Sequence, residues 1–169
     1  MTETIEVLER GRTIAYSFDD MLKYHGPGSP GGVAVAFKVL QRALPLLSPE
    51  GPPVRRNIAV RTAFGGPGAR DGFEMVTRAV SGERFTHDPD LARPERGREI
   101  ERFVFQVSLG DRAVTLLLCE GFVMAEFIDL ARKDGLSDDE KARLEVLKAE
   151  LAERVIGADA NDLFDLPDA

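Results

Sequence analysis

In HGPGSPGGVAVAFKVLQRAL, residues 25–44, a loop of glycines and prolines leads into a long apolar run, and the expected fold is organised around this segment. From Val33 to Leu44 the large apolar residues recur at helical spacing, which predicts a helix buried on most sides. A second loop, GGPG at residues 65–68, also precedes a helical pattern. Glycine permits close approach of a ligand and proline stiffens the chain, so two such loops predict the rims of a pocket.

Further helices are predicted on either side of these loops. Ser17 followed by Phe-Asp-Asp indicates an N-cap and a short helix ending near Tyr24. Pro45 is expected to end the long helix. After the second loop, residues 69–80 are predicted to be helical, with Gly82 as the stop.

The later chain predicts strands first and then two more helices. Residues 58–62 and 103–109 alternate with a period of two, and residues 113–119 are expected to be the antiparallel partner of the second run across Gly110-Asp111. Residues 83–87 are expected to form a short strand. Residues 122–133 are expected to be helical, with Gly135 as the end. Ser137 opens a capping box, after which the buried stripe is Leu144, Leu147, Leu151 and Val155.

Length and composition are those of one domain spanning residues 1–169. Hydrophobic residues make up 43% and charged residues 30%, which is typical of a globular protein rather than a disordered chain. Residues 1–16 fit a short helix or a strand equally well. The acidic tail, residues 159–169, carries apolar side chains that are expected to pack on the body or on a partner.

Charge and targeting signals restrict the function classes. A net charge of −7 argues against a nucleic-acid surface, because phosphate binding needs clustered Lys and Arg. The sequence contains no run of about 18 apolar residues, which a membrane-spanning helix would need. The acidic N-terminus lacks a signal-peptide pattern, so a cytoplasmic location is expected. Cys119 is the only cysteine, so the chain cannot form an internal disulfide. Neither glycine loop fits a P-loop or a dinucleotide fingerprint.

The first loop resembles that of the formylmethanofuran dehydrogenase FmdE family. Members of that family have His-Gly-His-x-Cys-Pro-Gly before an apolar helix, and His25-Gly26 and Pro30-Gly31 stand in those places. A second family block is matched in spacing by Asp71, Glu74, Thr77 and Gly82, and the resemblance extends loosely over residues 17–166. It implies an α+β fold, with a mixed, largely antiparallel sheet covered by helices, and often a homodimer.

The resemblance also implies a site between the two loops that in many members holds a metal, commonly zinc. This chain departs from the family where the ligands would stand. Pro27 and Ser29 replace the loop histidine and cysteine, and Gly68 and Ala79 replace the cysteines of the second block. These residues offer no donor comparable to thiolate or imidazole. No cofactor is therefore expected, and zinc or another divalent transition metal held by His25 is the alternative.

Six residues near the loops are candidates for the site: His25, Ser29, Arg61, Arg70, Asp71 and Glu74. His25 suits proton transfer near neutral pH, but it would serve equally well to cap the preceding helix or to anchor the loop. Arg70 and Asp71 are placed to grip an anion, although a solvated arginine and an acid at a helix N-terminus explain them as well. His87 is expected at the surface, and Cys119 is expected to be a small buried hydrophobe.

These observations favour a protein that binds a small anionic organic ligand between the two loops, with His25, Ser29, Arg61, Arg70 and Asp71 as ligand contacts. Two other functions stay open. One is an enzyme in which His25 and a carboxylate, Asp71 or Glu74, form an acid/base pair. The other is an accessory component of a larger oxidoreductase that needs metal ligands from a partner chain.

Overall fold

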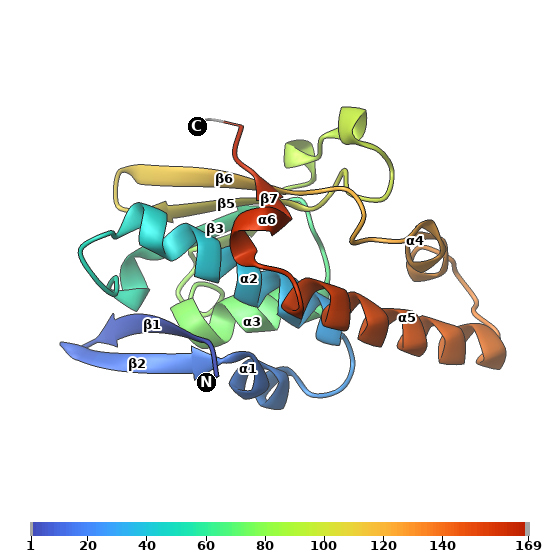
Figure 1. Ribbon diagram of the computed structural model, residues 1–169, viewed down its shortest axis with the longest axis horizontal. Coiled ribbons are helices and arrows are strands. Elements are labelled where there is room, and N and C mark those ends of the chain that lie inside the picture. Colours follow the sequence, from blue (N-terminus) through green and yellow to red (C-terminus); the bar gives the residue numbers. More distant parts are fainter. Residues whose placement is uncertain (1, 168–169) are drawn as a thin grey trace.

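A computed structural model describes residues 2–167 (Figure 1). The helices and strands are, in chain order, β1 (Thr4–Glu9), β2 (Arg12–Ser17), α1 (Phe18–His25), α2 (Pro30–Leu47), β3 (Ile58–Thr62), α3 (Pro67–Thr77), β4 (Phe85–His87), β5 (Val104–Leu109), β6 (Arg112–Leu118), α4 (Ala125–Ala131), α5 (Asp138–Ile156), α6 (Ala160–Leu163) and β7 (Phe164–Asp165). Short 3-10 turns occur at Arg55–Asn57, Pro89–Leu91 and Pro94–Arg96.

The central sheet has five strands in the order β4-β3-β5-β6-β7. Only β3 and β4 run parallel, and the other neighbours are antiparallel. Because helices lie against this sheet, the expected α+β class with a mixed, largely antiparallel sheet covered by helices is confirmed (Figure 1). The β5–β6 hairpin turns at Gly110-Asp111 as predicted, and Gly110 takes a φ of 62° that the tight turn requires.

The first residues, for which helix and strand were equally favoured, form a separate antiparallel hairpin of β1 and β2. Ile5 and Val7 are buried while Thr4 and Glu6 are exposed, and this alternation with a period of two is that of a strand. The hairpin leads straight into α1, whose N-cap Ser17 and Asp20 form a capping box. The predicted N-cap is therefore confirmed.

Helix α2 is the centre of the core, and its residues from Gly31 to Leu40 are all buried. It contacts the sheet on one side and α3 and α5 on others (Figure 1). The expectation that Pro45 ends the helix is wrong, because α2 continues through Pro45 to Leu47. One backbone hydrogen bond is lost there, while the buried side chains of Leu44 and Leu47 still pack on the core.

Two other helix ends differ from the prediction. Helix α3 begins at Pro67 and ends at Thr77, and Gly82 is not its stop. Arg78 takes the left-handed conformation instead, with a φ of 57°. The Thr77 hydroxyl donates to the Phe73 carbonyl and accepts from the Ala79 amide, which satisfies this end without a glycine.

The C-terminal helices are held by fewer buried residues than α2. Helix α4 is shorter than the expected 122–133 and buries only Ile128. Helix α5 begins with the predicted capping box at Ser137, but Leu144 of its expected stripe is only half-buried. In the tail, β7 pairs with β6, and Leu163 and Phe164 are buried. The tail's last two residues, 168 and 169, lie outside the described part.

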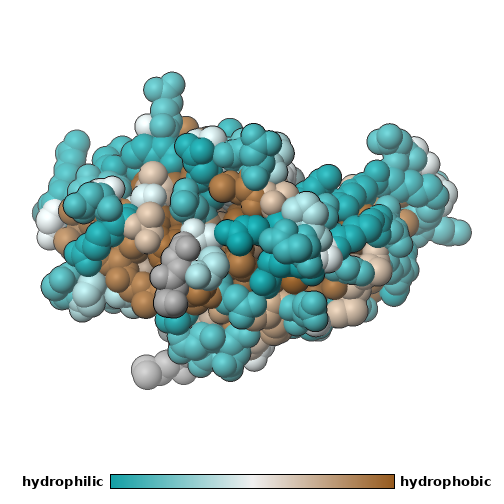
Figure 2. Space-filling view, turned by 90° about the horizontal axis from the view of Figure 1, so that it is seen from above, coloured by the Kyte–Doolittle hydropathy of each residue, from teal (hydrophilic) through white to brown (hydrophobic). Residues whose placement is uncertain are grey.

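The surface seen from above in Figure 2 is mostly hydrophilic, with patches of hydrophobic residues between charged ones. The tip at the right, where α4 and α5 meet, is mostly hydrophilic as well. Within residues 2–167, none of the helices is long and apolar enough to cross a membrane.

Candidate functional site

The two glycine-proline loops lie against each other, because α2 and α3 begin side by side. A Cβ atom added to Gly32 would lie 2.9 Å from the Ala69 amide nitrogen, and one added to Gly68 would overlap the Ser29 carbonyl oxygen. Neither Gly32 nor Gly68 has a positive φ. The glycines are therefore required for close contact between two helix starts rather than for unusual backbone torsions.

His25 lies on one side of this contact, and its side chain is only 8% exposed. Its Nε2 accepts a hydrogen bond from the Ser29 amide at 3.1 Å, so Nδ1 carries the ring proton. Nδ1 donates to the Asp71 carboxylate at 2.7 Å. His25 thus joins the end of α1, the first loop and α3, which is the anchoring role that the sequence allowed for this histidine.

Arg70 lies in a hollow of about 490 Å³ on another side of the second loop, bordered by Gly65 and Gly66. Glu83 and His87 line the same hollow. His87 donates from Nε2 to the Ala63 carbonyl at 3.2 Å. Neither Ser29 nor His25 lines this hollow, so the structure does not bring Arg70 together with the first loop.

Arg61 and Glu74 are each engaged elsewhere. Arg61 pairs with Asp88 at 3.0 Å on the exposed sheet face. Glu74 accepts from the amide and the hydroxyl of Ser81, behind the end of α3. Burial acts to raise the pKa of Glu74, but the Ser81 hydrogen bonds and the Arg78 charge outweigh it and hold the pKa below 4.5.

A pocket of about 430 Å³ opens between the two loops, and Ser29 is the one predicted site residue that lines it. Its floor is formed by the helix starts, Gly31, Gly32 and Gly65–Gly68. Its walls come from Phe64 after β3, from the segment just before β5, and from the α4–α5 region: Phe64, Arg102, Phe103, Phe127, Ile128, Ala131, Arg132, Leu144 and Lys148. This volume falls within the range of about 300–1,000 Å³ usual for small-molecule sites.

Three cations border the pocket, and its lining among the described residues holds no carboxylate. Burial, followed by the charge of Arg102, lowers the pKa of Arg132, so the two guanidinium groups repel each other. Glu101 lies 4.0 Å from Arg132. Lys148 donates to the Gly28 carbonyl at 3.0 Å. A bound anion would relieve the repulsion between the arginines.

The starts of α2 and α3 add to this positive potential. Neither N-cap, Ser29 or Gly66, makes a side-chain cap, and no acid occupies the first turn of either helix. Free amides and the positive end of the helix dipole favour an anion at such a position. The geometry therefore combines two helix starts, three cations and an apolar wall in one cavity.

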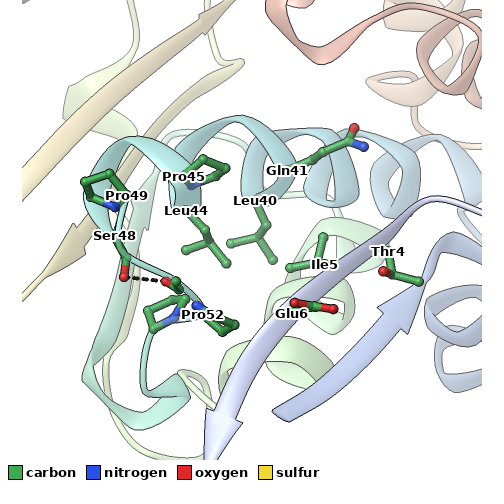
Figure 3. A pocket seen from close by; sticks show the side chains of 12 residues that line it. Thr4, Ile5, Glu6, Leu40, Gln41, Leu44, Pro45, Ser48, Pro49 and Pro52 are labelled. Atoms are coloured by element: carbon green, nitrogen blue, oxygen red, sulfur yellow. Dashed lines mark hydrogen bonds between the residues drawn. The ribbon is translucent and has the colours of Figure 1, made fainter.

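A larger cavity of about 620 Å³ lies elsewhere, between α2 and β1 (Figure 3). Ile5, Leu40 and Leu44 point into it, and prolines of the 49–53 loop close one side. Glu6 is the only charged residue in its lining, within the described chain. Its polar side chains are Thr4, Glu6, Gln41 and Ser48, and its described lining gathers no cluster of like charges, so the smaller pocket is the better candidate site.

The residues do not fit the metal site that the family resemblance implies. Among residues 2–167, no group of three or more His, Cys, Asp or Glu side chains is placed to hold a metal. Both ring nitrogens of His25 already make hydrogen bonds. Cys119 is half-buried, and burial and the charge of Asp165 raise the pKa of its thiol.

Sequence reasoning missed Arg102, Arg132 and Lys148 as site residues. They are distant from both loops in the chain and stand among ordinary surface charges, so no local pattern marks them. Two of them share a spacing: Ile128 and Arg132, like Leu144 and Lys148, are four residues apart, which places an apolar and a cationic side chain on one helix face. Arg102 has no such signal. No protein-family profile matches the chain, and no curated protein matches its sequence.

Proposed function

We propose that this protein binds a small anionic organic molecule in the pocket between the two glycine-proline loops. The observation that carries the proposal is the pocket itself, where Arg102, Arg132 and Lys148 gather in a chain of net charge −7. In such a chain, three clustered cations with no carboxylate in the same described lining favour an anion. The ligand contacts become Ser29 and these three residues.

The supporting contacts differ in how free each cation is to bind. Arg102 is exposed and offers a planar fork of donors for a carboxylate or phosphate. The side chain of Arg132 is 28% exposed, and its ion pair with Glu101 is long, at 4.0 Å. Lys148 donates to the Gly28 carbonyl and pairs with Glu145 at 3.4 Å, so it fixes the first loop and part of its charge is balanced. Arg102 is therefore the residue whose removal separates ligand binding from folding.

Kinship with the FmdE family, a homodimer and a cytoplasmic location remain part of this proposal. They rest on the two loops, the order of the elements and the composition. Light scattering of the purified protein measures the oligomeric state directly, and a monomer at micromolar concentration would contradict the dimer.

The enzyme hypothesis receives less support than the binding hypothesis. His25 and Asp71 do form the close pair that an acid/base mechanism needs, at 2.7 Å. However, Nε2 of His25 is occupied by the Ser29 amide, and neither residue lines the pocket. Glu74 is held by Ser81, so it does not join the pair. We therefore assign the pair to the stability of the loops.

The test is ligand binding by matched charge reversals. Native mass spectrometry of the purified protein looks for a copurified anion, and thermal melts with carboxylates and inorganic phosphate detect added ones. A ligand at about 100 times its Kd should raise Tm by about 5 °C or more. Arg102→Glu should abolish the shift, while Arg112→Glu on the remote β5–β6 hairpin should retain it. Equal binding by both variants would refute the proposal.

A further inference from the structure

The lining of the same pocket repeats one arrangement three times, an apolar side chain beside a cation. Phe103 and Arg102 are adjacent in the chain and both line the cavity. Leu144 and Lys148 lie one turn apart on α5, and Ile128 and Arg132 lie one turn apart on α4 and its cap. A site for a free inorganic anion needs only the cations, because water and phosphate gain nothing from the apolar partners.

The apolar part of the lining comes from several elements that face one cavity. The Phe64 ring stacks on Phe103, with centroids 4.4 Å apart and an angle of 27° between the rings. Phe127 and Leu144 are half-buried and line the same cavity from α4 and α5. Half-buried side chains still have apolar surface to cover, and covering it stabilises a complex by about 25 cal/mol per Å².

We propose that the ligand is an amphipathic anion, a carboxylate on a linear aliphatic body, with the carboxylate at Arg102 and Arg132 and the apolar body against Phe127 and Leu144. This inference rests on the proposed function and specifies the class of its ligand. A single carboxylate suits the arginines, since one guanidinium fork binds it through two parallel hydrogen bonds. The body suits Phe127 and Leu144, because neither side chain carries a hydrogen-bonding group.

Titration calorimetry with a homologous series measures the apolar contribution directly. The probes are sodium butyrate, hexanoate and octanoate, with hexanamide as the neutral analogue and inorganic phosphate as the anion without a body. Each pair of added methylenes should raise affinity about tenfold. Phosphate, which lacks the apolar body, should bind more weakly than hexanoate. Hexanamide, which lacks the charge, should also bind more weakly than hexanoate.

Two variants on α5 locate the apolar contact. Leu144→Gln should lower octanoate affinity about tenfold and leave phosphate affinity unchanged. Val146→Gln is the matched control, because Val146 is on the same helix, is 47% exposed and does not line the pocket. Thermal melts without ligand check that both variants fold.

The outcomes separate the two proposals. If phosphate and butyrate bind as tightly as octanoate and Arg102→Glu abolishes all three, the amphipathic ligand is refuted and the anion site stands. If Leu144→Gln and Val146→Gln have equal effects on octanoate, the body does not lie where we place it and the inference fails. If no anion binds, or if hexanamide binds as tightly as hexanoate, the anion site fails and the inference fails with it.

Discussion

Two polar clusters flank the same pair of loops, and they differ in how their groups are satisfied. In the His25 cluster, both ring nitrogens make hydrogen bonds, to Asp71 and to Ser29. In the arginine cluster, Arg102 and Arg132 line the pocket and repel each other. A buried polar group that is fully hydrogen-bonded stabilises the structure, whereas an exposed charge such as that of Arg102, or a loosely paired one such as that of Arg132, is available to a ligand. The loops thus separate a structural side from a binding side.

The largest expected effect comes from the contact between the loops. Gly68→Ala places a methyl group against the Ser29 carbonyl, where backbone cannot give way, and should lower the free energy of unfolding by about 3 kcal/mol. Urea denaturation measures the loss. Gly28→Ala is the control, because its added Cβ would meet only the His25 ring at 3.8 Å. Equal losses at both positions would show that the loops do not touch as described.

Removal of the structural cluster should have the next largest effect. His25→Ala leaves the Asp71 carboxylate and the Ser29 amide without their partners and should cost about 2 kcal/mol in the free energy of unfolding. His87→Ala, the matched change at the other histidine, removes one bond of 3.2 Å and should cost less. Chemical denaturation of both variants measures the difference. A His25 variant as stable as the His87 variant would reopen a functional role for His25.

A smaller, pH-dependent effect is expected at Glu74, whose carboxylate binds Ser81 just after the end of α3. Glu74→Gln should cost about 1 kcal/mol at neutral pH, because the Ser81 hydrogen bonds and the Arg78 ion pair favour the carboxylate. The pKa of Glu74 is lowered on folding, so this stabilisation is present above pH 4.5 and is lost as the pH falls through the folded-state pKa. Melts between about pH 3 and pH 7 check the trend, with the exposed Glu50→Gln as control. A difference that persists unchanged at the acidic end would rule out the charged interaction.

The smallest effect on stability is expected on the binding side. Arg102→Gln removes no ion pair among the described residues, so the free energy of unfolding should change by less than about 0.5 kcal/mol. Urea denaturation measures this change. Together with a loss of anion binding, this result would separate function from folding at one residue. A destabilisation as large as that of His25→Ala would place Arg102 in the structural part of the molecule.

Local signals predicted much of the fold. The capping residues Ser17 and Ser137 mark the starts of α1 and α5, and Gly110-Asp111 marks the hairpin turn. Pro45 does not end α2, because burial of Leu44 and Leu47 outweighs one missing hydrogen bond. Gly82 does not end α3, because the Thr77 side chain already hydrogen-bonds the backbone at the end of this helix.

Most element types and the two loops follow from the amino-acid order alone, because capping, turn chemistry and hydrophobic period act between residues close in the chain. Which polar groups are free depends on the folded arrangement. Folding places Asp71 on His25, which makes the most conspicuous candidate an anchor. It also brings Arg102, Arg132 and Lys148 from three separate segments to one cavity. Burial and pairing depend on contacts between distant residues, and no local pattern encodes them.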